Sequence, residues 1–381
     1  MTMNNESQLN QAFAAYQARQ FDLSEQLARA VLSQDPGHGD ALYLLGLLAA
    51  QSGAFSLAED LLYQAARLFP DIDAYGCALA MVLQKQGRWD EALEHYKRYQ
   101  SQPAVLTQMG QIYLGKNQEL YARECFDKAL SADKNNPDAL IGIAQMHIIH
   151  HRWRAAEKVL NRIALETPDK WYYLARVYRK TKRFRPAYRA IDTALQTPHP
   201  FYWVERGLIA WEDKKHANAI EAFQNAIQMN PYSAEAFYYL GRVYADGGRW
   251  DEAINAYGQA LKCDAAHVEA HQHLAEALCR AGRLAEGLEH YRQAVVLNPR
   301  HVPTLFQLAV LLENMGEFEE AAGLYFNVLS LAPKHPKVSR RIARTLQELS
   351  RTHRKLAQKL AAGWVKNCPR DKNAQSIHKI I

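Results

Sequence analysis

Residue types in this chain repeat with a period of 34 residues, and this periodicity restricts the possible folds more than any other property of the sequence. Each period contains two small residues, the second about three helical turns after the first, and an aromatic residue about one turn after the second small residue. This trio recurs in register at Gly207, Ala219 and Phe223, at Gly241, Ala253 and Tyr257, at Ala275, Gly287 and Tyr291, and at Ala309, Ala321 and Tyr325.

The spacing of this trio predicts two antiparallel helices that cross closely. Small residues allow the helix backbones to approach, and the ring fills the seam between them. One such hairpin cannot bury its own apolar face, so neighbouring copies must stack on each other. Pro and Gly are sparse and fall at spaced points, as helices joined by short turns require. The sequence therefore predicts an all-α repeat array.

The residues of these copies resemble the tetratricopeptide repeat, whose pattern is W-x2-L-G-x2-Y, then A-x3-F, then P. Copies of the pattern are seen at Phe237, Leu240, Gly241, Tyr244, Ala253 and Tyr257; at Trp203, Gly207, Ala219, Phe223 and Pro231; at Trp171, Leu174, Ala175, Tyr178 and Ala187; at Leu106, Gly110, Tyr113, Ala122, Phe126 and Ala129; and at Leu42, Leu45, Gly46, Ala58, Ala65 and Pro70. The resemblance implies a right-handed α-solenoid of about ten helical hairpins.

Small residues used as anchors place the repeats within residues 1–335. The expected starts lie near residues 5, 39, 73, 103, 137, 168, 200, 234, 268 and 302. The spacing shortens after 73, after 137 and after 168, where we expect the second helix to end early. The first repeat has Ala12, Ser24 and Ala28 in place but lacks an aromatic plug.

The segment after the array shows one apolar stripe at spacings of three, four or seven residues. Its members are Val338, Ile342, Leu346, Leu349, Leu356, Leu360 and Trp364. This pattern predicts one long, basic, amphipathic capping helix over residues 336–368 that covers the open face of the last repeat. We expect residues 369–381 to form a flexible tail.

In the family that the chain resembles, the first helix of each hairpin lines a concave groove that holds a bound peptide or helix. Transferred position by position, the groove residues are Tyr172, Tyr173, Arg176, Arg179, Phe201, Trp211, Tyr238, Tyr239, Arg242, His273 and Phe306. Tyr and Arg are enriched in binding hot spots, so this wall suits a protein partner. The alternative is that one tyrosine of each pair only packs against a neighbouring helix.

Charge is distributed unevenly along the chain. Residues 334–381 carry a net charge of +11, whereas the preceding residues carry −5. The basic residues predicted to lie on the surface are Arg340, Arg341, Arg344, Arg351, Arg354, Lys355 and Lys359. They offer an alternative function, in which this helix binds RNA, an anionic membrane surface or an acidic protein. A solubilising cap on an acidic array explains the same charge, and we do not expect nucleic acid or membrane as the main partner.

No catalytic or cofactor-binding motif was found. GxxxxGK[ST], GxGxxG, HExxH and GxSxG are absent. Histidines cluster at His147, His150 and His151 and at His267, His271 and His273, but packing explains them better than a metal site does. We therefore predict a protein without enzyme activity, cofactor or metal.

The location is predicted to be cytoplasmic. The first ten residues lack the features of a secretory signal, and no apolar run is long enough to span a bilayer. The five cysteines are scattered and odd in number, as expected for reduced thiols. Oligomeric state stays open, because the stripe that ends at Trp364 could fold back on the array or pair between chains.

Overall fold

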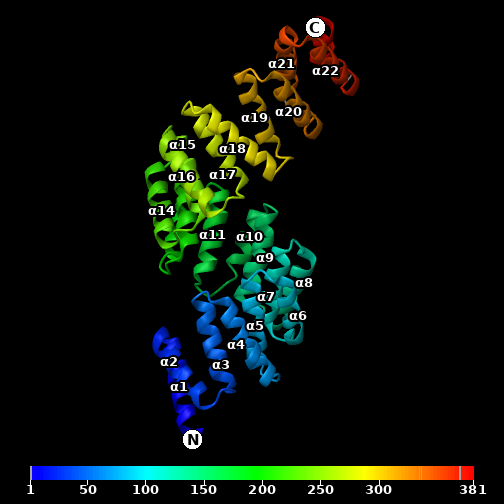
Figure 1. Ribbon diagram of the computed structural model, residues 1–381. Coiled ribbons are helices and arrows are strands. Elements are labelled where there is room, and N and C mark those ends of the chain that lie inside the picture. Colours follow the sequence, from blue (N-terminus) through cyan, green and yellow to red (C-terminus); the bar gives the residue numbers. More distant parts are fainter. Residues whose placement is uncertain (1, 334, 336, 369) are drawn as a thin grey trace. The chain divides into compact units, whose positions relative to one another are not determined.

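The computed structural model describes residues 2–333, 335, 337–368 and 370–381, and the side chains from residue 5 onward. Every regular element in these residues is a helix, and no strand occurs among them (Figure 1). The predicted all-α fold is confirmed. None of the described helices has the length and apolar character that crossing a bilayer requires.

The helices fall into two compact units, residues 1–182 and residues 183–381. Unit 1 contains α1 (Thr2–Gln17), α2 (Phe21–Gln34), α3 (Gly39–Gln51), α4 (Phe55–Leu68), α5 (Asp73–Lys85), α6 (Trp89–Tyr96), the short 3-10 helix η1 (Lys97–Tyr99), α7 (Pro103–Gly115), α8 (Glu119–Ala132), α9 (Pro137–Ile149), α10 (Trp153–Leu160) and α11 (Pro168–Lys180). Unit 2 contains α12 (Phe184–Ala194), α13 (Pro200–Glu212), α14 (His216–Met229), α15 (Ala234–Asp246), α16 (Trp250–Cys263), α17 (Val268–Arg280), α18 (Leu284–Leu297), α19 (Val302–Met315), α20 (Phe318–Leu331), α21 (Val338–Thr352), α22 (Arg354–Asn367) and α23 (Lys372–Ile380).

Within each unit, an odd-numbered helix packs against the even-numbered helix that follows it, and that second helix packs against the first helix of the next pair. This order holds from α1 to α11 and from α12 to α20. Each pair covers the apolar face of its neighbour, as expected for a solenoid in which contacts are local.

The turn after each odd-numbered helix from α1 to α19 contains one residue with positive φ. These residues are Arg19, Gly53, Gly87, Asn117, His151, Lys182, Lys214, Gly248, Gly282 and Gly316, with φ between 56° and 87°. Glycine adopts this left-handed backbone without steric cost, whereas Arg, Asn, His and Lys must be held in it by the surrounding turn. One left-handed residue therefore marks each of ten turns.

The glycine of the first helix is where the hairpin closes most tightly. A Cβ atom built on Gly207 would lie 2.6 Å from the ring of Phe223, and one built on Gly241 would lie 2.7 Å from the ring of Tyr257. Both rings are fully or almost fully buried. In these two hairpins only a residue without a side chain leaves room for the ring, which is the physical reason for glycine at this slot.

Three second helices are shorter than the others. Helices α6 and α10 have 8 residues each and α12 has 11, whereas α14, α16, α18 and α20 have 14. These helices lie where the repeat spacing in the sequence contracts. The shorter repeats therefore differ from the 34-residue repeats by a second helix that ends early.

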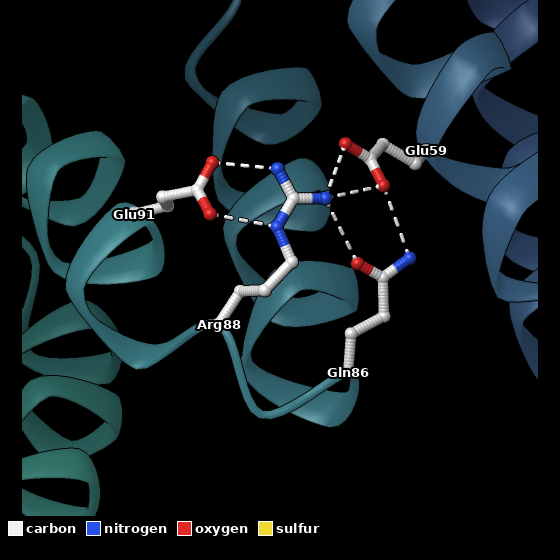
Figure 2. A network of polar contacts seen from close by, with 4 residues as sticks. All are labelled: Glu59, Gln86, Arg88 and Glu91. Carbon is white, nitrogen blue, oxygen red and sulfur yellow. Dashed lines mark hydrogen bonds and ion pairs between the residues drawn. The ribbon is translucent and has the colours of Figure 1, made fainter.

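A polar network ties the turn between α5 and α6 to the preceding hairpin (Figure 2). Arg88 donates to both carboxylate oxygens of Glu59 on α4, at 2.6 and 2.7 Å, and to both carboxylate oxygens of Glu91 on α6, at 2.7 and 2.5 Å. Gln86 donates to Glu59 at 3.0 Å. The bond from Arg88 lowers the pKa of the Glu91 carboxyl. The bidentate geometry fixes the orientation of the turn more than it adds stability, because the groups face solvent.

The prediction of one long helix over residues 336–368 is wrong. The segment forms two helices, α21 and α22, that pack together and are separated at His353, whose φ and ψ are −133° and 64°. The fold-back lets Leu346 and Trp364, one on each helix, both become buried in the same core. A straight helix would have left the second half of the apolar stripe in water.

The prediction of a flexible tail is also wrong for residues 370–381; residue 369 lies outside the described residues. Helix α23 forms there and packs against α21 and α22. The Asp371 side chain accepts hydrogen bonds from the backbone N–H groups of Asn373 and Ala374 at its start. Ala374 and Ile377 are buried. An N-cap and a short apolar face are enough to hold this helix.

Candidate functional site

One cluster of aromatic and polar side chains in unit 2 lies on three successive first helices. The indole Nε1 of Trp211 at the end of α13 donates to Asp246 Oδ2 at the end of α15, at 2.7 Å. The guanidinium carbon of Arg242, one turn before Asp246, lies 4.9 Å from the centre of the Trp211 ring. A cation over the face of Trp is attracted by the negative face of the ring, so Arg242 and Trp211 hold each other in place.

Arg242 also connects α15 to α17. Its Nη1 donates to the Tyr238 hydroxyl at 3.1 Å and lies 3.4 Å from His273 Nε2. The other ring nitrogen of His273 lies 3.6 Å from Glu276 Oε2, and this contact lowers the pKa of the Glu276 carboxyl. The groups that contact Arg242 directly are thus a phenol, an imidazole and an indole, and the carboxylates of Asp246 and Glu276 lie close enough to interact with its charge. The partly buried guanidinium still has donors to offer.

The two tyrosines of α15 have different environments. Tyr238 is 8% exposed, and its ring packs against the rings of Tyr257, His267 and His273. Tyr239 is partly exposed and lies between Phe223, with which it stacks at 5.9 Å, and Trp211, at 6.1 Å. Tyr238 therefore mainly serves packing, as the alternative interpretation of the sequence held, whereas Tyr239 lies on the surface of the cluster.

Unit 1 contains a smaller cluster of the same kind on α11. The guanidinium carbon of Arg176 lies 5.7 Å from the centre of the Tyr172 ring and 5.9 Å from the centre of the Tyr173 ring. The Tyr173 hydroxyl accepts a hydrogen bond from Gln145 Nε2 on α9. Tyr173, Arg176 and Gln145 line a hollow of about 260 Å³. Burial raises the pKa of the Tyr173 hydroxyl, which therefore stays protonated as a donor.

Three other predicted groove residues lie in different surroundings. Arg179 is buried, with 4% of its surface exposed. Phe201 is 55% exposed at the start of α13, where its ring contacts only the His199 ring among the aromatic contacts described. Phe306 on α19 packs against Tyr325 and His335 in the C-terminal core. Trp211, Tyr238, Tyr239, Arg242 and His273 are brought together.

Some residues of the predicted basic surface form ion pairs with carboxylates of the chain itself. Arg341 Nη1 donates to the buried carboxylate of Glu313 on α19 at 2.9 Å, so this arginine anchors α21 to the last hairpin. Arg344 lies 3.7 Å from the same carboxylate and is 72% exposed, and Arg351 pairs with Glu348. Arg340, Arg354, Lys355 and Lys359 are exposed.

The histidines that the sequence grouped together make different polar contacts. His150 lies 2.6 Å from Glu119, His267 caps the start of α17, and His271 lies 3.1 Å from His290. The rings of His267 and His273 both pack against Tyr238. No group of three or more His, Cys, Asp or Glu side chains suited to a metal ion occurs within the described ranges.

Asp246 was not among the predicted groove residues. It is the last residue of α15 and lies 35 residues after Trp211, one more than the repeat period, and this spacing is the only sign of the contact in the sequence. The contact depends on the stacking of one hairpin on the next. Repeat arithmetic alone cannot predict it, because side-chain direction within the turn decides which residues meet.

Comparison with known families agrees with the repeat pattern. A family model described as tetratricopeptide repeat matches residues 9–71, 172–234, 204–267 and 238–302. Other models with the same description match residues 290–322, 78–101 and 103–136. These matches are spread over both units.

Comparison with individual proteins points in the same direction. The TPR repeat-containing protein MJ1428 of Methanocaldococcus jannaschii is 23% identical over 272 residues, which are 64% of this chain and 47% of that protein. The chain thus spans about half the length of this relative. Yeast Tom70 has a similar fold, with a TM-score of 0.50 and 12% identity over 94% of this chain and 99% of that chain. PilF of Pseudomonas aeruginosa, at a TM-score of 0.48 and 17% identity, covers 55% of this chain and 97% of its own.

Proposed function

This chain belongs to the tetratricopeptide repeat family, and we propose that it is a non-catalytic scaffold that captures a peptide or helix of a partner protein. An adaptor, a chaperone and an assembly factor all work in this way. In this proposal the capture site is the cluster of Trp211, Tyr239, Arg242 and His273. The buried Tyr238 packs against His273 and accepts a hydrogen bond from Arg242.

One observation carries the proposal. First helices of three successive hairpins contribute aromatic rings and a guanidinium to one place, and the contacts between these side chains cross from hairpin to hairpin. Such residues are more than the repeat needs, because the seams are already filled by Phe223 and Tyr257. Partly exposed Trp, Tyr and Arg are the residue types that dominate binding hot spots.

The remaining donors of Arg242 indicate what the partner should contain. A half-buried guanidinium surrounded by a phenol, an imidazole and an indole favours a carboxylate or a backbone carbonyl at its open side. An apolar side chain beside that acceptor would cover the Trp211 and Tyr239 rings.

A cytoplasmic location is part of the same proposal, and the support is that all five cysteines are unpaired.

The test compares two variants in partner capture. Trp211→Ala combined with Arg242→Ala should weaken binding of a partner recovered with the wild-type chain by about thirtyfold or more, since hot-spot truncations cost about 2 kcal/mol or more. Tyr232→Ala is the matched control, because Tyr232 is an aromatic residue of the same unit that is 83% exposed outside the cluster. Affinity measured by calorimetry should not change in the control. Equal binding by the wild type and the double variant would refute the proposal.

A second function is supported by the exposed basic residues of α21 and α22. Arg340, Arg354 and Lys355 could bind RNA, an anionic membrane or an acidic protein. Replacing all three with Gln should then abolish binding that also falls steeply with salt. The Trp211 and Arg242 variant would leave such binding intact, so the two functions give opposite results.

A further inference from the structure

Helices α20 and α22 border a cavity of about 570 Å³ in unit 2 that the proposed capture site does not use. Its walls are mostly apolar and include Phe326 and Leu329 from α20 and Leu360 and Trp364 from α22. The rings of Phe326 and Trp364 meet edge to face at 6.3 Å. A volume of this size is typical of small-molecule sites and exceeds the space that one partner side chain fills.

Among the described residues that line this cavity, Lys359 is the only charged one, and Ser330, Asn367 and Cys368 are neutral. Lys359 lines the cavity, is exposed, and has no ion-pair partner among the described residues. Glu348 and Asp371 are the only acidic residues in the sequence from 321 onward. Glu348 pairs with Arg351, and Asp371 caps α23, so neither acidic side chain of this segment pairs with the lysine.

A second cavity, in unit 1, has a different distribution of charge on its walls. The hollow of about 740 Å³ among α2, α3 and α4 is larger, but Asp22, Glu25 and Arg29 line it together. Mixed charges on its wall favour no single class of ligand. The cavity between α20 and α22 instead combines apolar walls with one charged side chain among its described lining residues, Lys359.

We propose that the cavity between α20 and α22 binds a free fatty acid. The acyl chain lies between Phe326, Leu329, Leu360 and Trp364, and the carboxylate pairs with Lys359. The apolar chain gains free energy by leaving water, and the rim charge selects an anionic head group. The site is separate from Trp211 and Arg242, so it stands or falls independently of the proposed scaffold function.

Gly363 gives a direct way to close the cavity. It lines the cavity on α22, and a Cβ atom built on it meets no other atom within 4 Å. Gly363→Leu should therefore fill the cavity without straining the helix. Gly323→Leu is the matched control, because Gly323 is also a helical glycine of unit 2 with open space at its Cβ and does not line the cavity.

The experiment is calorimetric titration of the full-length chain with dodecanoate below its micelle concentration. We expect one saturable site, at least about tenfold weaker binding by Gly363→Leu, and unchanged binding by Gly323→Leu. Lys359→Glu should weaken binding by about fivefold or more, since it removes a rim ion pair and adds repulsion. Octanoate should bind more weakly by about fourfold for each buried methylene group it lacks.

Several outcomes would overturn the proposal. Equal affinity of the wild type and Gly363→Leu would show that dodecanoate binds elsewhere. Equal affinity for dodecyltrimethylammonium would rule out selection by Lys359. Binding to vesicles containing phosphatidylglycerol without binding to free dodecanoate would make the surface a membrane contact, and preference for a Glu-rich amphipathic peptide would make it a protein contact. If Gly363→Leu fails to fold, the Lys359→Glu result decides.

Discussion

At the scale of single residues, the tyrosine that fills a hairpin seam also brings a hydroxyl into the core. The Tyr325 hydroxyl donates to Glu313 at 2.7 Å, and the Tyr96 hydroxyl donates to Gln84 at 3.4 Å; each acceptor lies twelve residues before its tyrosine. At Tyr257 the corresponding residue is Ala245, and the hydroxyl is buried with no hydrogen-bond partner in the described part of the chain. The buried tyrosine hydroxyl is therefore hydrogen-bonded in the repeat of Tyr325 and lacks a described partner in the repeat of Tyr257.

This difference predicts opposite effects of the same substitution. Tyr325→Phe removes a bond to a buried carboxylate and should lower the free energy of unfolding by about 1.5–3 kcal/mol. Tyr257→Phe removes an unpartnered buried hydroxyl and should leave stability unchanged or raise it by about 1 kcal/mol. Urea unfolding of both variants checks this. Destabilisation of similar size in both would show that the hydroxyls do not act through these contacts.

At the scale of elements, the hairpin is held by the close approach of its two helices. The backbone of α13 comes so near to α14 that the Phe223 ring lies where a side chain on Gly207 would begin. Even in the first hairpin, which lacks an aromatic plug, the buried Ser24 hydroxyl donates to Ala12 O at 2.9 Å. Small residues, with or without a ring, thus define the seam.

Glycine to alanine changes should therefore have opposite signs at two helical positions. Gly207→Ala forces an added methyl against Phe223, which is fully buried, and should destabilise unit 2 by about 1–3 kcal/mol. Gly258→Ala on α16 meets open space and should stabilise the same unit by about 0.5–1 kcal/mol through helix propensity. Thermal and urea unfolding followed by circular dichroism measure both. A stabilising Gly207→Ala would contradict the contact with Phe223.

At the scale of the whole molecule, stability is local because helices contact mainly their neighbours along the chain. Pairs of helices pack in order within unit 1 and within unit 2. Such an array gains stability from each repeat and from each nearest-neighbour interface, and a local defect weakens its surroundings first.

Hydrogen exchange should display this locality. In Gly207→Ala, amides of α13, α14 and α15 should lose protection, whereas amides of α3 and α4 should exchange as in the wild type. Mass spectrometry of peptides from both regions reports the difference. Uniform loss of protection across the chain would show one cooperative fold instead of an array.

Most of the fold could be predicted from the sequence, because its determinants are local and repeated. A small residue, a second small residue and a ring at fixed spacing fix one hairpin, and repetition fixes the array. The C-terminal segment could not be predicted in the same way. Its apolar stripe is compatible with one helix or two, and burial of Trp364 against Phe326 is a long-range gain that periodicity does not encode.

The candidate site divides in the same manner. The repeat register places Trp211, Tyr239 and Arg242 on first helices, and this could be read from the sequence. The contact of Trp211 with Asp246, the burial of Tyr238 and the ion pair of Arg341 with the buried Glu313 arise only when the hairpins stack. A repeat pattern specifies backbone position, whereas contacts between hairpins depend on side-chain direction and stacking, which a single sequence does not record.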